Sequence, residues 1–195
     1  MDPSEVIGSL SIRAGDGLVV AMRSGFCFLD LKTGDVTPIV DPESHLPENR
    51  FNDGRCDRQG RFWAGTLHDV DAAQPVAALY RLDETLGYTR VVGNIRIANS
   101  LCRSPDGRTM YFGDSPERVI WAWDYDTETG DIANRRVFTE IPQEHGYPDG
   151  ATVDEEGHVW VAHWDGSRLT RFNPEGNVER VAMLPVQRPT CPMFA

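Results

Sequence analysis

The sequence has 195 residues, 40% hydrophobic and 25% charged, so it is long enough and apolar enough to bury the core of a globular protein. Its formal net charge of −11 argues against nucleic acid or an anionic membrane as the main partner, because both are bound by basic surfaces. No apolar run approaches the roughly 18 residues that a helix needs to cross a bilayer.

The four cysteines are widely separated, and none belongs to a Cys-x-x-Cys pair. This spacing favours buried free thiols over a zinc site or a small protein held together by disulfides. Residues 1–5 lack the basic start and apolar stretch of a secretory signal peptide. We therefore expect a cytoplasmic protein, and the sequence sets no expectation for its oligomeric state.

A repeat of short β-rich segments runs along the whole chain. Its marker is a turn glycine before a strand-like run, at intervals of 43, 47 and 50 residues: Gly17, Gly60, Gly107 and Gly157. Runs such as 18–22 and 159–162 are too short and too rich in β-branched or aromatic residues for helices. This period is typical of a β-propeller blade. We predict an all-β chain forming a single β-propeller domain, 1–195, with blade-like repeats near residues 6–48, 49–95, 96–143 and 146–187.

Each of the last three repeats carries an amide or carboxylate side chain eight residues before its turn glycine, namely Asn52, Asn99 and Asp149. Residues just before the innermost strand of a propeller blade lie around one mouth of the central channel, so we expect these three to converge there. Ser9 holds the equivalent place in the first repeat. Its neutral hydroxyl is not a usual ligand of a hard divalent cation, so Ser9 is left out of the site.

Two amide oxygens and a carboxylate suit Ca²⁺, Mg²⁺ or Mn²⁺ better than a metal that prefers thiols. The alternative is that the Asn-Asp-Gly and Pro-Asp-Gly sequences only form turns, where they are very common. Their shared register leaves both interpretations open. The sequence has no motif of a serine hydrolase, a zinc protease or a nucleotide-binding loop.

Further polar side chains are expected at the same mouth. Arg50 lies two residues before Asn52, so both face one side of an extended segment, where a guanidinium suits an oxygen-rich ligand. A salt bridge from Arg50 to a nearby acid is the equally open alternative. Asp69 can accept hydrogen bonds from substrate hydroxyls or be a solvated loop acid. For Asp114 and His163 we expect structural roles.

Five short motifs occur at 49–54 (Asn-Arg-Phe-Asn-Asp-Gly), 62–66 (Phe-Trp-Ala-Gly-Thr), 97–100 (Ile-Ala-Asn-Ser), 147–150 (Tyr-Pro-Asp-Gly) and 188–191 (Arg-Pro-Thr-Cys). Together they resemble the regucalcin (senescence marker protein)/gluconolactonase/luciferin-regenerating-enzyme family, over nearly the whole chain. The resemblance implies a six-bladed β-propeller that hydrolyses sugar lactones with one divalent cation in its central channel. About four of those blades are recognisable here.

The resemblance also implies roles for single residues. Asn99 and Asp149 correspond to metal ligands, and Asp149 also corresponds to the base that acts on the attacking water. Arg50 and Asn52 correspond to substrate contacts. Asp69 falls at or beside the place of a substrate-contacting Glu, and its side chain is shorter.

The family pattern differs from this sequence at three places. Ser100 stands where a Gly usually follows the ligand Asn, a change that narrows the pocket. The family's third protein ligand is a Glu in a blade before the stretch that residues 1–5 begin, and residues 192–195 stop where the family continues into another blade. The resemblance thus implies an internal fragment, truncated at both ends.

The sequence therefore predicts divalent-metal-dependent hydrolysis of a sugar lactone to the aldonic acid. The expected cofactor is one cation (Ca²⁺, Zn²⁺, Mn²⁺ or Mg²⁺), and the expected partner is the small-molecule lactone. The alternatives are a non-catalytic propeller that binds calcium or another protein, and an inactive fragment of a lactonase.

Overall fold

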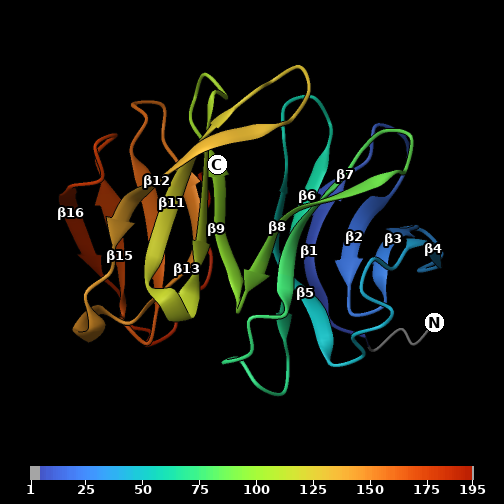
Figure 1. Ribbon diagram of the computed structural model, residues 1–195, viewed down its shortest axis with the longest axis horizontal. Helices are drawn as coiled ribbons and strands as arrows, with labels where there is room; N and C mark the ends of the chain where they lie inside the picture. Colours follow the sequence, from blue (N-terminus) through green and yellow to red (C-terminus); the bar gives the residue numbers. More distant parts are fainter. Residues whose placement is uncertain (1–4, 195) are drawn as a thin grey trace. The chain divides into compact units, whose positions relative to one another are not determined.

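The computed structural model describes residues 5–194, which form sixteen β-strands and two short 3₁₀ helices. The strands make four antiparallel sheets of four strands, each ordered as in the sequence (Figure 1). The chain divides into two compact units, Met1–Ala98 (unit 1) and Asn99–Ala195 (unit 2), and each is described by itself.

Unit 1 holds the first two sheets. The first consists of β1 (Ile7–Ile12), β2 (Leu18–Met22), β3 (Gly25–Leu29) and β4 (Val36–Val40). The second consists of β5 (Asn49–Cys56), β6 (Phe62–His68), β7 (Ala77–Leu82) and β8 (Tyr88–Ile95). Buried aromatic rings join the two sheets: the Phe26 ring centroid lies 4.5 Å from that of Phe51 and 5.8 Å from that of Phe62.

Unit 2 holds the other two sheets. The third consists of β9 (Ala98–Arg103), β10 (Thr109–Asp114), β11 (Val119–Tyr125) and β12 (Ile132–Glu140), with helix η1 (Ser115–Glu117) after β10. Helix η2 (Gln143–His145) leads to β13 (Tyr147–Val153), β14 (Val159–Trp164), β15 (Arg168–Phe172) and β16 (Val178–Met183). Phe138 joins the two sheets, because its ring centroid lies 4.8 Å from that of Tyr111 and 6.2 Å from that of Phe172.

The four repeat glycines lie in the turns between the first and second strands of their sheets. All four have a left-handed backbone, with φ between +74° and +87°, which L side chains rarely adopt. At Gly60, Gly107 and Gly157 the N–H donates to the carbonyl oxygen three residues earlier. Because this turn recurs in three of the four sheets, and Gly17 has the same left-handed backbone in the first, the glycine spacing matches the blade repeat. The predicted all-β fold of about four propeller blades is confirmed.

The strands begin earlier than the sequence predicts. Asn52, Asn99 and Asp149 lie inside β5, β9 and β13 and not just before them. In β5 and β13 the reason is pairing that starts upstream and is then interrupted, at Phe51/Gly54 and at Pro148/Ala151. Such an irregularity keeps a segment in the sheet while turning its side chains away from the regular alternation.

The cysteines depart in part from the expectation of buried thiols. Cys27 and Cys102 are buried, whereas Cys56 is half-buried and Cys191 is exposed. Burial raises the pKa of the Cys27 thiol, which keeps it protonated near neutrality. No helix within residues 5–194 is long and apolar enough to cross a membrane.

Candidate functional site

The predicted metal ligands lie together in unit 2. Asn99, near the start of β9, is 6% exposed, and its amide Nδ2 donates to the hydroxyl Oγ of Ser115 at 2.7 Å. The same hydroxyl lies 2.6 Å from the carbonyl oxygen of Pro148, the residue before Asp149. One serine hydroxyl thus connects the side chain of Asn99 to the segment of β13 that carries the half-buried Asp149.

The backbone around Asp149 is held from outside the β13–β14 ladder. The register of that ladder shifts between Pro148 and Ala151. The N–H of Gly150 donates to the carbonyl oxygen of Thr190 at 2.7 Å. The carbonyl oxygen of Asp149 itself accepts a hydrogen bond from Ser100. An amide oxygen of set direction and a carboxylate on a held strand are donors that suit a hard divalent cation.

The predicted substrate contacts lie together in unit 1. The guanidinium of Arg50 donates from Nε to Asp69 Oδ1 at 2.7 Å and from Nη1 to the amide oxygen of Asn52 at 3.4 Å. Asn52 in turn donates from Nδ2 to the carbonyl oxygen of Ala98 at 2.9 Å. The salt-bridge alternative for Arg50 is therefore observed, and it joins Arg50 to another of the predicted contacts.

Asp69 is held as a charged acceptor. The hydrogen bond from Arg50 is the main cause that lowers the pKa of its carboxyl, and the charges of Arg50 and Arg23 add to the effect. Arg23 also forms a close ion pair with the second carboxylate oxygen. Two guanidinium groups thus share one carboxylate whose side chain remains 31% exposed.

Asp114 and His163 are both buried, at 4% and 1% exposure. Burial lowers the pKa of His163 to about 4, so its imidazole is neutral near pH 7. Its Nδ1 lies 3.0 Å from the carbonyl oxygen of His145. Because a carbonyl only accepts, Nδ1 carries the proton.

A comparison with known families decides where this chain belongs. The family described as SMP-30/Gluconolactonase/LRE-like region matches residues 1–195. The chain is a member of that family.

The relatives agree with this membership. L-arabinolactonase of Azospirillum brasilense is 42% identical over 180 residues, which is 90% of this chain and 59% of that protein. Regucalcin of Danio rerio is 34% identical over 196 residues, or 100% of this chain and 66% of that protein. The solved structure of a calcium-binding protein, regucalcin, from Agrobacterium tumefaciens str. C58 superposes with a TM-score of 0.91 at 31% identity, and covers 97% of this chain and 64% of that one.

The chain spans 59–66% of the length of these three family members. Their likeness establishes a partial β-propeller for this chain.

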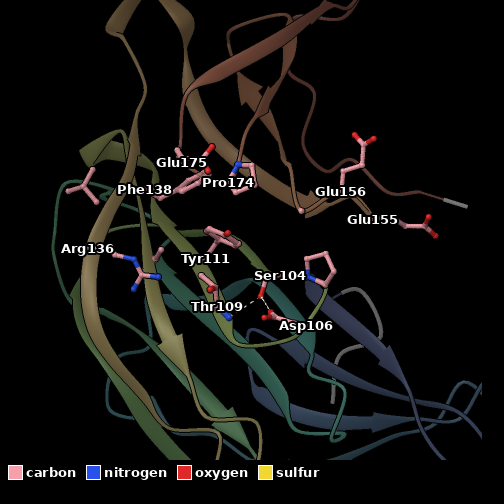
Figure 2. A pocket seen from close by; sticks show the side chains of 14 residues that line it. Ser104, Asp106, Thr109, Tyr111, Arg136, Phe138, Glu155, Glu156, Pro174 and Glu175 are labelled. Atoms are coloured by element: carbon pink, nitrogen blue, oxygen red, sulfur yellow. Dashed lines mark hydrogen bonds between the residues drawn. The ribbon is translucent and has the colours of Figure 1, made fainter.

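A pocket of about 550 Å³ lies in unit 2 (Figure 2), and no described residue that lines it belongs to the family motifs. Tyr111 and Phe138 contribute apolar surface to it, and the Ser104–Asp106 turn lies at the end of β9 opposite Asn99. Among the described residues that line this pocket, none is a predicted ligand or substrate contact.

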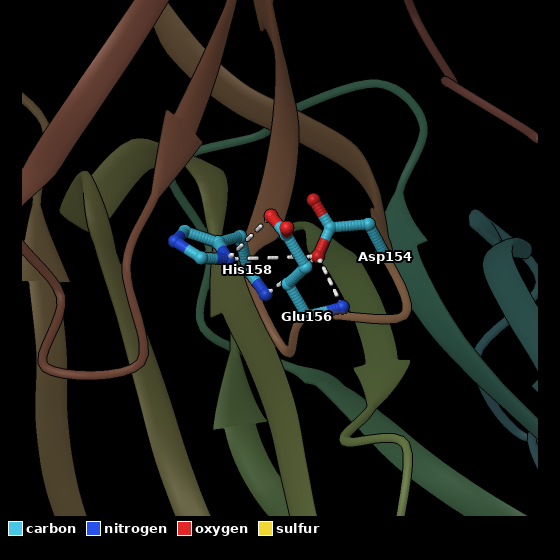
Figure 3. A group of neighbouring side chains, drawn as sticks. All are labelled: Asp154, Glu156 and His158. Atoms are coloured by element: carbon cyan, nitrogen blue, oxygen red, sulfur yellow. Dashed lines mark hydrogen bonds and ion pairs between the residues drawn. The ribbon is translucent and has the colours of Figure 1, made fainter.

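Unit 2 also contains a group of charged side chains that the sequence analysis did not predict: Asp154, Glu156 and His158 (Figure 3). The sequence signal was three titratable side chains within five residues, which form the turn between β13 and β14. His158 Nδ1 lies 3.6 Å from Asp154 Oδ1 and 3.9 Å from Glu156 Oε2. Arg171 lies 2.7 Å from Asp154 and forms close ion pairs with Glu156 and Glu179. With a guanidinium already among the carboxylates, this group is an ion-pair network beside a turn.

Proposed function

We propose that this chain belongs to a divalent-metal-dependent lactonase that hydrolyses a sugar lactone to the aldonic acid. The observation that carries the proposal is the hydrogen-bonded connection in unit 2 between Asn99 and the strand that bears Asp149. The names of two family members, L-arabinolactonase and 6-deoxy-6-sulfogluconolactonase, support lactones as the substrate class.

Asn99 and Asp149 would hold the cation, which is Ca²⁺, Zn²⁺, Mn²⁺ or Mg²⁺. A bound divalent cation would polarise a carbonyl and acidify a water molecule. Asn99 contributes a neutral amide oxygen whose direction is set by its bond to Ser115. Asp149 contributes a carboxylate, and its strand is held by hydrogen bonds from outside the ladder.

Asp149 is also the proposed base. It takes a proton from the attacking water as the water oxygen bonds to the lactone carbonyl carbon. The ring carbon–oxygen bond then breaks, the ring oxygen takes up a proton as an alcohol, and the carbonyl carbon becomes the carboxyl of the aldonic acid. Water is the only second reactant, so the step balances.

Arg50, Asn52 and Asp69 are proposed to orient the lactone. A guanidinium is a donor to carbonyl and hydroxyl oxygens, and the charged Asp69 accepts from hydroxyl groups. These side chains hydrogen-bond to one another in unit 1, so they are held in place before a substrate binds. A bound lactone would replace some of these hydrogen bonds with its own. We also propose a cytoplasmic location, because none of the four cysteines forms a disulfide.

The experiment is a pH-stat assay of lactone hydrolysis with five- and six-carbon sugar lactones, with and without added Mn²⁺ or Ca²⁺. Asp149→Ala should lower metal-dependent turnover by about 100-fold or more, since it removes both a ligand and the base. Asp124→Ala removes an exposed carboxylate of the same unit, paired with Arg136, and is the matched control. Near-normal hydrolysis by Asp149→Ala would end the assignment.

A non-catalytic cation-binding propeller is the second candidate. It is favoured by the salt bridge that already occupies Arg50 and Asp69, and by a family member described as a calcium-binding protein. The same assay with a cation titration beside it separates the two. This candidate predicts that the unmutated protein binds the cation and hydrolyses none of the lactones, and that Asp149→Ala loses the binding.

A further inference from the structure

Two serine hydroxyls of unit 2 hold consecutive carbonyl groups of β13. Ser115, the first residue of η1, lies with its Oγ 2.6 Å from the Pro148 carbonyl oxygen. Ser100 in β9 donates from its Oγ to the carbonyl oxygen of Asp149. The two serines are 5% and 0% exposed, so bulk water has little access to replace either bond.

The backbone of β13 has a local need for such partners. Its pairing with β14 runs through Pro148 and resumes at Ala151, so the regular register skips Asp149 and Gly150. Backbone groups left out of a ladder must be satisfied elsewhere. The hydroxyls of Ser100 in β9 and Ser115 in η1 take that role for the carbonyls of Asp149 and Pro148.

The proton count at Ser115 fixes the orientation of Asn99. A hydroxyl has one proton to donate, and the Pro148 carbonyl can only accept it. The Asn99 atom 2.7 Å from the same oxygen must therefore be the donor NH₂. The amide oxygen of Asn99 therefore points away from Ser115. This determines which terminal atom of the amide is nitrogen and which is oxygen, a choice that the shape of the amide alone leaves ambiguous.

Ser100 occupies its place against a backbone preference. Its φ of 58° lies in the left-handed region, which costs a residue with a Cβ free energy that glycine does not lose. Ser100 packs beside Gly113 of the neighbouring strand, where an added Cβ would lie 3.4 Å from both the Cβ and the Oγ of Ser100. The hydroxyl bond to Asp149 is the interaction that glycine at position 100 could not make.

We propose that Ser115 and Ser100 are positioning residues that set the direction of the Asn99 amide oxygen and the place of Asp149, and thereby the affinity for a divalent cation. The inference rests on the proposed function for the ligand role of Asn99 and Asp149. Without the Ser115 hydroxyl, the Asn99 amide loses the acceptor that holds its NH₂ group, and an NH₂ turned toward the cation would repel it. Without the Ser100 hydroxyl, the irregular segment of β13 loses the bond at the ligand residue itself.

The test is a titration of the 195-residue chain with Mn²⁺, in which free Mn²⁺ is read by electron paramagnetic resonance. Ser115→Ala and Ser100→Gly should each weaken binding about tenfold or more. Ser115→Thr keeps the hydroxyl and should recover most of the affinity. Ser104→Ala is the matched control, because Ser104 is a serine of the same unit whose hydroxyl also donates one hydrogen bond and accepts one, away from the proposed ligands.

Thermal unfolding of the metal-free variants separates positioning from mere stabilisation. Ser100→Gly relieves the left-handed strain, so its metal-free stability should fall less than that of Ser104→Ala while its cation affinity falls more. Parent-like affinity in both Ser115→Ala and Ser100→Gly, or equal weakening in Ser104→Ala, would overturn the positioning role alone. A parent chain that binds no Mn²⁺ would overturn the proposed metal site and the positioning role with it.

Discussion

Asn52 in unit 1 and Asn99 in unit 2 stand at the same place in the repeat, yet they are held by different chemistry. Asn52 accepts from the charged Arg50 and donates to a backbone carbonyl. Asn99 donates to the neutral hydroxyl of Ser115 and has little solvent exposure. Equivalent positions in a repeat therefore place the same type of side chain on the same strand. The hydrogen-bond partners from neighbouring segments determine what that side chain can bind.

The same contrast extends to charge. In unit 1 the candidate residues form an ion-paired group in which Arg23 and Arg50 share Asp69. In unit 2 the hydrogen bonds that Ser115 and Ser100 make to Asn99 and to the carbonyls of β13 join neutral groups. A guanidinium repels a cation, whereas these neutral hydrogen bonds add no charge beside the candidate ligands. The two regions should therefore respond differently to substitution, to metal and to pH.

The largest expected difference is in cation binding by the two asparagines. Asn99→Ala removes a proposed ligand and should weaken Mn²⁺ binding by about 100-fold, or roughly 2.7 kcal/mol. Asn52→Ala removes the equivalent side chain of the previous repeat and should change the dissociation constant less than about twofold. Isothermal titration of both variants checks this, and equal losses would break the distinction between the two regions.

The next effect is an acid sensitivity of unit 2. The folded His163 has its pKa lowered to about 4 against an ordinary 6.5, so the unfolded chain binds the proton first as pH falls. The free energy of unfolding should decrease by about 1–3 kcal/mol between pH 6.5 and 4. His163→Asn should flatten that decrease in urea unfolding curves, and an unchanged decrease in this variant would contradict the assignment to His163.

A smaller effect is expected from Arg50. Arg50→Met keeps much of the side-chain length but removes the guanidinium, so the KM for the lactone should rise about tenfold, or roughly 1.4 kcal/mol. The dissociation constant for Mn²⁺ should stay unchanged, because the proposed cation ligands are Asn99 and Asp149. Steady-state kinetics and a metal titration of one preparation give both numbers. A tenfold loss of cation affinity instead would show that Arg50 serves the metal.

The smallest effect is the titration of Asp69. Because Arg50 is the main cause of its lowered pKa, Arg50→Met should move that pKa up toward the ordinary value, with Arg23 still in place. A lowered carboxyl pKa stabilises the fold above the unfolded value of about 3.9 and loses that effect as pH falls through the folded value. The exposed side chain limits the stability change to about 0.5–1 kcal/mol. The carboxyl ¹³C shift of Asp69 against pH measures it, and an unmoved midpoint would assign the effect to Arg23.

The blade repeat could be predicted from sequence because it rests on local turns. Gly60, Gly107 and Gly157 each donate a hydrogen bond to the carbonyl oxygen three residues earlier. Each turn is therefore determined by a few consecutive residues of the sequence. Counting back from these glycines also located Asn99 and Asp149 on the first strands of neighbouring sheets. Local backbone geometry is the part of a fold that sequence spacing reports most directly.

The partners of those residues could not be predicted in the same way. Ser115 lies 33 residues from Pro148, and nothing in either segment marks the other. The convergence of Arg171 and Glu179 on the Asp154 turn likewise depends on how strands pair. Such contacts depend on the register of strand pairing. In β5 and β13 that register shifts where the pairing is interrupted, and nothing in the sequence marks the shift.

The most direct test of the central claim is thermal unfolding of the 195-residue chain with and without Ca²⁺, Mn²⁺ or Zn²⁺, beside Asp149→Ala. A ligand at about 100 times its dissociation constant adds roughly 2.7 kcal/mol to a folded protein that binds it. The account predicts one cooperative transition that a divalent cation raises in the unmutated chain and leaves unmoved in Asp149→Ala. An equal shift in both chains, or none in the unmutated chain, would contradict a cation site built on Asn99 and Asp149.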